Sequence, residues 1–360
     1  MCFPFANRLQ TYVIIPLIIL AAGAVLFPVT ILQSSASNCK PLWKHSLRGG
    51  NSIAISNDGK FVVASSEGSG LGNDNILTSF EGNSSIPIWQ TNSSGNAWDF
   101  PQLTMSADGT RFSLEGPAYS EWVGLWKNPG AGLQWTFPDH LLRTSLTGLP
   151  TPATDVAVSG DGQYVAVRTF EPSYSDTLYL LRTGSNVPLW SYNLGNPNEY
   201  KFDEALGISY EGAYVATIKD ESLLLFGQHD NQTLWVAKTP AYRIVMSSTA
   251  DQILAADNTT ISEYSKNDNS TLATFRFGLL IDFDVSSDGT TLAVTSGDRY
   301  NHPTSISAWN LNTHEQVFNN PSRDAFVHVS GNGERIVESY FGFTVLDATG
   351  KQICTSDVSR

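Results

Sequence analysis

The feature that most constrains the fold is a short hairpin pattern that recurs along the chain. Its clearest copy, from Asp155 to Arg168 (DVAVSGDGQYVAVR), places two alternating apolar runs on either side of a Ser-x-Asp-Gly corner. Period-two alternation predicts strands with one packed face, and Asp-Gly supplies the positive φ that a tight turn needs. The chain carries seven copies, whose motif serines are Ser56, Ser106, Ser159, Ser209, Ser247, Ser286 and Ser330.

The spacing of these serines predicts the architecture. Successive copies lie about 40 to 50 residues apart, which is the period of propeller blades built from short strands. Thr249 and Ala250 replace Asp-Gly in the fifth copy, and Asn332 replaces Asp in the seventh, but the apolar spacing persists. We therefore predict an all-β, seven-bladed β-propeller over residues 41–360.

A later strand of most repeats carries an aromatic residue after an apolar one. We interpret these aromatics as one structural position, packed between blades, because burying a Trp removes a large apolar area from water. An exposed ligand surface is the alternative. The residues are Trp43, Trp89, Trp135, Trp190 and Trp235.

These motifs resemble those of known propeller families. Ser-x-Asp-Gly before an apolar strand is similar to the first turn of WD-repeat propellers. SISAWNLNTHEQV (305–317) is similar to a WD-repeat third strand, with Asn310 in place of the family's Asp. LDATGKQI (346–353) and LRTGSNVPLW (181–190) resemble a turn of the quinoprotein-like propellers. The resemblance implies the fold and leaves the function open, because propellers host unrelated activities.

An apolar segment precedes the predicted propeller. Residues 12–32 (YVIIPLIILAAGAVLFPVTIL) carry no charge and are long enough to cross a bilayer as a helix. We interpret them as an uncleaved transmembrane anchor between a short lead (1–11) and a linker (33–40). A long signal peptide, cleaved near Ser34-Ser35-Ala36, is the alternative.

The side of the membrane is indicated by opposing signals. Lys40, Lys44 and Arg48 follow the span and Arg8 alone precedes it, which by the positive-inside rule favours a cytoplasmic propeller. Five Asn-x-Ser/Thr sequons favour the exterior. We expect the exterior, with these asparagines as glycosylation candidates: Asn83, Asn92, Asn231, Asn258 and Asn269.

The cysteines support the same expectation. A propeller closes its ring by joining its chain ends, so Cys39, before the first strand, and Cys354, in the last one, should be neighbours. We predict a disulfide between them, since disulfides persist mainly in oxidising compartments and closing a long loop stabilises the fold. Two unrelated thiols are the alternative.

Composition and motifs exclude several function classes. The formal net charge of −13 argues against a nucleic-acid partner, which requires clustered Lys and Arg. The chain has no Gly-x-Ser-x-Gly, His-Glu-x-x-His, Cys-x-x-Cys or phosphate loop. We expect no cofactor, no metal and no catalytic residues.

The loops that enter the innermost strands provide candidate ligand-binding residues at the channel mouth. A charged rim there could hold a cation or a basic peptide, although the carboxylates lack the dense spacing of a calcium loop; a solvated set of loops without a ligand is the alternative. The candidates are Asp155, Asp203, Arg243, Asp282 and Asp324.

Two polar residues break the pattern of small residues two places before the motif serine. Asp284 and His328 stand there in adjacent blades. Because a buried Asp or His costs free energy unless it is paired, we predict a structural pair that hydrogen-bonds internally or to channel water.

An aromatic cluster in the second repeat is a candidate surface for sugar rings or a partner protein, with ordinary blade packing as the alternative. It comprises Trp98, Tyr119, Trp122 and Trp126. The sequence thus predicts a membrane-anchored, extracytoplasmic propeller that binds or assembles a protein or glycan. A propeller enzyme (hydrolase, lyase or quinoprotein type) with its site at the channel mouth and a structural cell-envelope component are the alternatives.

Overall fold

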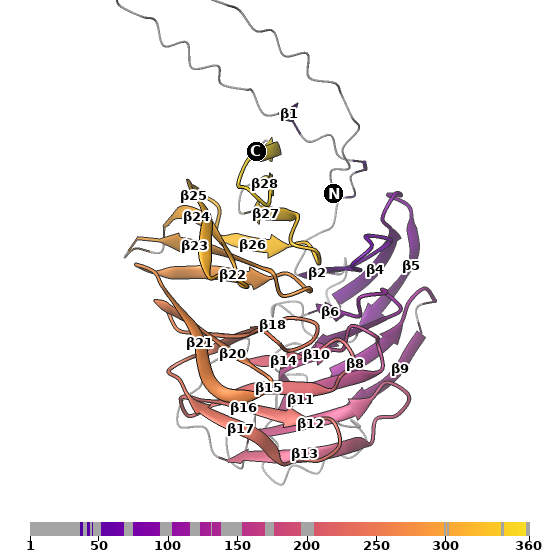
Figure 1. Cartoon of the computed structure of the whole chain (residues 1–360). Helices are drawn as coiled ribbons and strands as arrows, with labels where there is room; N and C mark the ends of the chain where they lie inside the picture. Colours follow the sequence, from indigo (N-terminus) through magenta and orange to yellow (C-terminus); the bar gives the residue numbers. More distant parts are fainter. Residues whose placement is uncertain are drawn as a thin grey trace, which may run out of the picture.

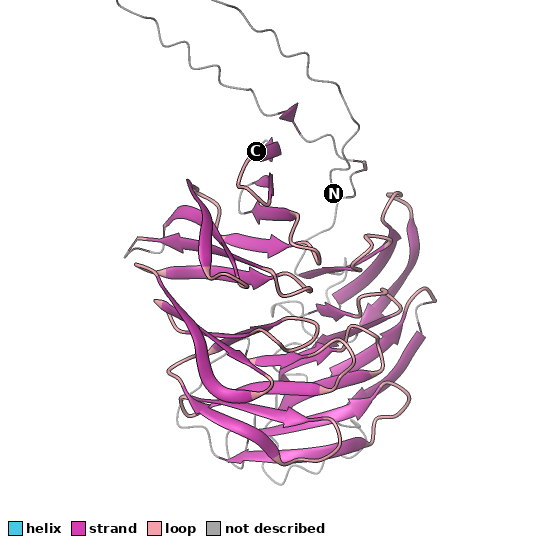
Figure 2. Ribbon diagram, viewed as in Figure 1, coloured by secondary structure: helices cyan, strands magenta, loops and turns pink. Residues whose placement is uncertain are grey.

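The structure is a computed structural model in which every regular element is a β-strand (Figure 2). It describes residues 37–38, 42–43, 45, 52–67, 75–93, 103–115, 123–130, 132–137, 153–169, 176–195, 205–298, 300, 302–339 and 342–357. The predicted anchor (12–32) and lead (1–11) lie outside these residues. Within the described ranges, no helix is long and apolar enough to cross a membrane.

Seven sheets form the blades of a β-propeller, as predicted (Figure 1). Each contains an antiparallel meander of four strands that follow one another in the chain, and the sheet of blade 7 gains β1 as a fifth strand. Blades 1 to 3 comprise β2 (Ser52–Ile55), β3 (Phe61–Glu67), β4 (Asn75–Glu81) and β5 (Pro87–Ser93); β6 (Leu103–Met105), β7 (Arg111–Glu115), β8 (Val123–Lys127) and β9 (Gly132–Phe137); and β10 (Ala153–Val158), β11 (Tyr164–Thr169), β12 (Asp176–Arg182) and β13 (Pro188–Gly195). Blades 4 and 5 comprise β14 (Leu206–Ile208), β15 (Tyr214–Lys219), β16 (Ser222–Gly227) and β17 (Thr233–Lys238); and β18 (Arg243–Met246), β19 (Ile253–Ala256), β20 (Thr260–Ser265) and β21 (Asp268–Arg276). Blades 6 and 7 comprise β22 (Leu280–Val285), β23 (Thr291–Gly297), β24 (Pro303–Asn310) and β25 (Glu315–Pro321); and β26 (Phe326–Val329), β27 (Arg335–Ser339), β28 (Gly342–Asp347) and β29 (Gln352–Asp357).

The Ser-x-Asp-Gly motif builds the turn between the first two strands of a blade. In blade 3 the Ser159 hydroxyl accepts a hydrogen bond from the Tyr164 amide (2.9 Å) and donates one to Asp161 (2.6 Å). Gly162 takes the predicted positive φ, 67°. In the fifth copy Ala250 is held at φ 58°, so the degenerate turn keeps its shape although an L-residue disfavours that conformation.

Apolar clusters join neighbouring blades. Leu178 and Leu180 of blade 3, for example, pack with Leu206 and Phe226 of blade 4. Equivalent clusters occupy the junctions from blades 1 and 2 through blades 6 and 7. The hydrophobic core is therefore divided among the junctions between sheets, as expected for sheets that are apolar on both faces.

The repeated tryptophans occupy one structural position. Each indole donates Nε1–H to the turn before the outer strand of the next blade, which agrees with the packing interpretation. The bonds join Trp43 to Gly82 O (3.0 Å), Trp89 to Asn128 Oδ1 (3.0 Å), Trp135 to Thr183 O (2.9 Å), Trp190 to Gln228 O (3.0 Å) and Trp235 to Lys266 O (3.3 Å).

Backbone hydrogen bonds also link the first turns of successive blades. They run from Asn57 N to Ala107 O (2.8 Å), Ala107 N to Gly160 O (2.8 Å), Asp161 N to Tyr210 O (2.9 Å), Tyr210 N to Ser248 O (2.8 Å), Ser248 N to Ser287 O (2.9 Å) and Asp288 N to Gly331 O (3.0 Å). These bonds join each blade to the next one in the chain, from blade 1 to blade 7.

The junction between blades 7 and 1, here called the seam, differs from the other six. The two blades are neighbours (Figure 1), since a Cβ on Gly331 would lie 3.8 Å from Asn57 Nδ2. Among the described residues, however, no turn-to-turn bond and no shared apolar cluster joins them. Ile53 and Ile55 on β2 are 61% and 46% exposed, whereas Val327, which corresponds to Ile53 in blade 7, is 1% exposed.

An N-terminal segment reaches both sides of the seam. β1 (Ser37–Asn38) pairs in parallel with β29 of blade 7, with Ser37 opposite Cys354. A few residues later, Trp43 stacks on Phe80 of blade 1 with ring centroids 5.2 Å apart. The N-terminal segment thus fastens the ring, as the predicted joining of chain ends requires.

Candidate functional site

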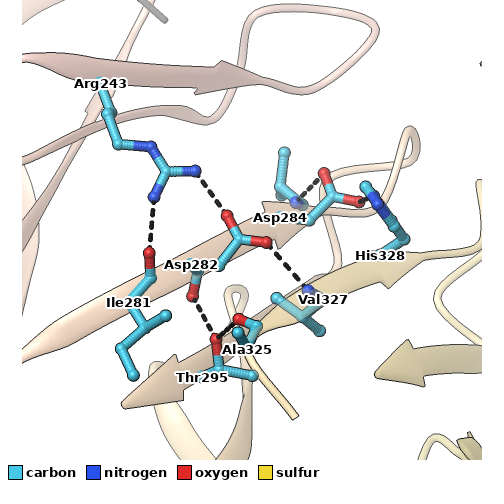
Figure 3. A network of polar contacts seen from close by, with 9 residues as sticks. Arg243, Ile281, Asp282, Asp284, Thr295, Ala325, Val327 and His328 are labelled. Carbon is cyan, nitrogen blue, oxygen red and sulfur yellow. Dashed lines mark hydrogen bonds and ion pairs between the residues drawn. The ribbon is translucent and has the colours of Figure 1, made fainter. Parts of the chain in front are cut away.

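Two of the five predicted channel-mouth residues, Arg243 and Asp282, meet between blades 5 and 6. The innermost strands are the first strands of each blade, which contact one another around the ring. Arg243 on β18 donates Nη2–H to Asp282 on β22, and its Nη1–H reaches Ile281 O at 3.1 Å (Figure 3). The guanidinium also lies over the Phe283 ring, 5.0 Å from its centroid. Arg243 is thereby held by a charge pair, a carbonyl and an aromatic face.

Asp282 and Asp284 also hold the inner edge of blade 7. The second carboxylate oxygen of Asp282 accepts from Val327 N at 2.9 Å (Figure 3), and Asp284 accepts from Val329 N at 2.8 Å. β26 ends its sheet, so these amides face no neighbouring strand. Side chains two residues apart on β22 therefore accept from the free edge of β26, and Asp284 does so from a position that holds a small residue in most other blades.

The predicted pair of Asp284 and His328 is close but is not a direct hydrogen bond. His328 Nδ1 lies 3.9 Å from Asp284 Oδ2, and the His328 side chain is 75% exposed. We expected a buried histidine; instead it faces solvent because Val327 and Val329, on the other face of β26, take the packed positions against blade 6. The amides of Val329 and Val285, rather than the imidazole, satisfy Asp284.

Burial raises the pKa of Asp284 to about 6. The Val329 amide is the largest influence that opposes this rise, followed by the charge of His328, whereas the nearby carboxylate of Asp282 adds to it. Asp284 consequently titrates within reach of physiological pH, although its contacts are those of a structural group.

The remaining three predicted rim residues lie in other places or outside the described residues. Asp155 is buried in blade 3 and is 3% exposed. Asp324 is half-buried in the loop before β26, and Asp203 lies outside the described residues. The described part of the chain contains no cluster of three or more His, Cys, Asp or Glu side chains that could hold a metal ion.

One of the four residues of the predicted aromatic surface, Trp126, lies within the described residues. Trp98, Tyr119 and Trp122 lie outside the described residues. Trp126 is 3% exposed and stacks on Phe112 with centroids 5.5 Å apart. Its expected surface role is therefore wrong: Trp126 belongs to the core between blades 1 and 2.

The five sequon asparagines are all exposed, which is compatible with their being glycosylation candidates. Of the predicted disulfide, Cys354 is 3% exposed on β29, at the place that Trp190 has in blade 3. Cys39 lies outside the described residues, one position after the strand that pairs with Cys354. The disulfide stays a prediction.

Two buried carboxylates were not anticipated. Glu263 Oε2 lies at hydrogen-bond distance, 3.0 Å, from His314 Nε2. Glu338 accepts a hydrogen bond from the Ser322 hydroxyl at 2.5 Å. Burial raises the pKa of both carboxyls. Glu338 lies two residues after Ile336, on the same buried face of β27. No motif marks either glutamate, because each partner comes from another part of the chain.

Comparisons with known proteins support the fold. No protein-family model and no curated protein matches the chain. Among solved structures, it is similar to the β-propeller domain of Cps50 (Swd1) from Myceliophteria thermophila, with a TM-score of 0.58 and 10% sequence identity. The match covers 88% of this chain and 98% of that domain. At this identity the likeness shows the fold alone, a β-propeller, which agrees with the seven blades of this chain.

Proposed function

We propose that this protein is a membrane-anchored, extracytoplasmic propeller that binds a partner protein along the outer edges of its blades. The observation that carries this proposal is the pairing of β1 with β29. There an extended segment already lies on an outer strand, in parallel, so the geometry of a blade edge accepts a further strand. Addition of a strand to an exposed edge is a common mode of peptide recognition.

The outer strands of blades 3 and 4 carry exposed aliphatic side chains that such a partner could contact. Val187 and Leu189 beside β13 are 68% and 46% exposed, and Leu234 and Val236 on β17 are 53% and 43% exposed. Within the described residues neither strand pairs with a further strand. An uncovered edge with aliphatic side chains invites pairing with another chain.

The nature of these side chains favours a protein over a glycan. Sugar rings stack on exposed aromatic rings, whereas the exposed residues on these edges are aliphatic, and Trp126 is buried. The channel residues Arg243 and Asp282 are engaged with each other and with backbone groups. The outer edge is therefore a better candidate than the channel mouth.

The anchor and the exterior location are supported by the sequence of residues 12–32 and by the exposure of the sequon asparagines. They complete the proposal: the anchor would hold the propeller at the membrane surface, where its blade edges remain free for a partner.

Site-specific photo-crosslinking in the native membrane tests this function. A photoreactive residue at position 189 or 234 should give the same protein adduct, and Leu189→Asp should weaken the adduct formed from position 234. Thr274→Asp, which adds the same charge to an exposed position of β21, is the matched control and should leave it unchanged. Adducts only from position 328 in the channel, or none from either edge, would contradict the proposal.

A further inference from the structure

A polar side chain recurs in the turn that leads into the outer strand, or at the second residue of that strand in blade 5, and reaches the preceding blade. Asn186, Asn231 and Asn269 each lie four residues before the place that holds Trp190 in blade 3, Trp235 in blade 4 and Ala273 in blade 5. Each donates Nδ2–H to a backbone carbonyl of the outer strand of the preceding blade. The acceptors are Thr136 O (3.4 Å), Ser191 O (2.9 Å) and Val236 O (2.9 Å).

Blade 6 carries a histidine at the same position. His314 lies four residues before Phe318, which takes the tryptophan place there. Its Nε2 lies 3.0 Å from Glu263 of blade 5. A side chain at this turn position therefore joins four successive pairs of blades, from blades 2 and 3 through blades 5 and 6. We call the three asparagine contacts the inter-blade clamps.

Two of the clamps fall on sequons. Asn231 and Asn269 are followed by Gln-Thr and Ser-Thr, so both are sequence candidates for a glycan. The glycan would be attached to Nδ2, the atom that makes the clamp. Attachment would replace one of its two hydrogens with a bulky sugar, on an atom that lies 2.9 Å from the neighbouring blade.

The other three sequons differ. Asn83, Asn92 and Asn258 are exposed, and within the described residues no hydrogen bond involves their Nδ2. Asn258 uses only its Oδ1, which accepts from the Tyr242 hydroxyl. In these three the nitrogen is available without loss of a contact between blades.

We propose that Asn231 and Asn269 are inter-blade clamps that stay unmodified, and that carbohydrate on this protein is confined to Asn83, Asn92 and Asn258. The glycan part rests on the exterior location proposed above, whereas the clamp part does not. A bare Asn231 also leaves the exposed Leu234, three residues later, free of carbohydrate, as the proposed partner surface requires.

Sequon occupancy is the direct test. Protein from its native membrane is treated with a glycosidase that converts glycosylated Asn to Asp in heavy-oxygen water, and each sequon peptide is then analysed by mass spectrometry. We expect the label at one or more of Asn83, Asn92 and Asn258. Label at Asn231 or Asn269 would overturn the inference, whereas a complete absence of label would contradict the exterior location and leave the clamps to the second test.

The second test measures the clamps in the unglycosylated full chain. Asn269→Asp removes the donor, whereas Thr271→Ala destroys the same sequon without touching the clamp. The first should lower Tm by about 2 °C, the shift expected from one lost hydrogen bond in a chain of this size. Thr271→Ala and Asn83→Asp should leave Tm unchanged, and equal melting of Asn269→Asp and these controls would refute the clamp.

Discussion

The unusual pKa of Asp284 makes a quantitative prediction about stability and pH. A carboxyl whose pKa rises from its usual value of about 3.9 to about 6 on folding favours the folded state most when it is protonated. The stability that Asp284 contributes is fully present below the pKa that this carboxyl has in the unfolded chain, and it is lost as pH rises through 6. Between pH 8 and pH 5 the folded state should gain about 1.4 kcal/mol from this group.

This gain in the free energy of unfolding is an upper limit, because 26% of the Asp284 side chain is exposed and solvent screens its interactions. Asp284→Asn removes the titration and keeps an oxygen that can accept from the Val329 amide. We expect the urea midpoint of the wild-type protein, relative to that of the variant, to be higher at pH 5 than at pH 8. Since Glu263 and Glu338 titrate in both proteins, the difference between the two isolates Asp284.

Asp58→Asn is the matched control. The pKa of Asp58 is lowered, chiefly by the amide of Lys60 and the hydroxyl of Ser56. The stability that Asp58 contributes is therefore lost only below its unfolded pKa, outside the window of the experiment. If Asp284→Asn and the wild-type protein respond identically to pH, or if the difference has the opposite sign, the assignment of a buried, protonatable carboxyl is wrong.

Two further predictions concern the turns and the channel. Gly212→Ala should lower Tm, because φ is 66° there and the added Cβ would lie 2.4 Å from Tyr164 Cδ2, whereas Gly184→Ala, with no atom within 4 Å, should melt like the wild-type protein; equal melting of both variants would contradict the turn geometry. Arg243→Met should cost about 2 kcal/mol in urea unfolding, since it leaves the 13%-exposed Asp282 side chain without its cation, whereas exposed His328→Ala should cost less than about 0.5 kcal/mol; a larger loss for His328→Ala would restore the structural role first expected for it.

The sequence predicted the blades because their determinants are local. Ser159, Asp161 and Gly162 build one turn from adjacent residues, and the same spacing repeats in the other copies. The shared position of the tryptophans was also predictable, because Trp190 recurs at a fixed place relative to its strand. What the pattern could not give was the hydrogen-bond acceptor of each indole, which belongs to the next blade.

The candidate site was less predictable because its contacts join distant residues. Asp282 was predicted as a channel-mouth residue and Asp284 as an exception in the repeated pattern, but both accept from backbone amides of another blade, which the sequence pattern does not reveal. The alternation of side chains along β26 decides that His328 faces solvent, and only the packing against blade 6 fixes which set of alternate residues is buried. The inter-blade clamps were not predicted because an asparagine in a sequon looks the same in the sequence whether its amide is free or bonded to another blade.

The contacts that close the propeller determine which part of the fold a pulling force on the N-terminal segment would disrupt first. Six junctions are bonded through cores and turns, whereas the contacts that the described residues show at the seam are those of β1 with blade 7 and of Trp43 and His45 with blade 1. If residues 12–32 hold the chain in a membrane, any force between the bilayer and a bound partner passes through these same few residues. Tension on the tether would therefore strain the closure of the propeller before it reached any blade.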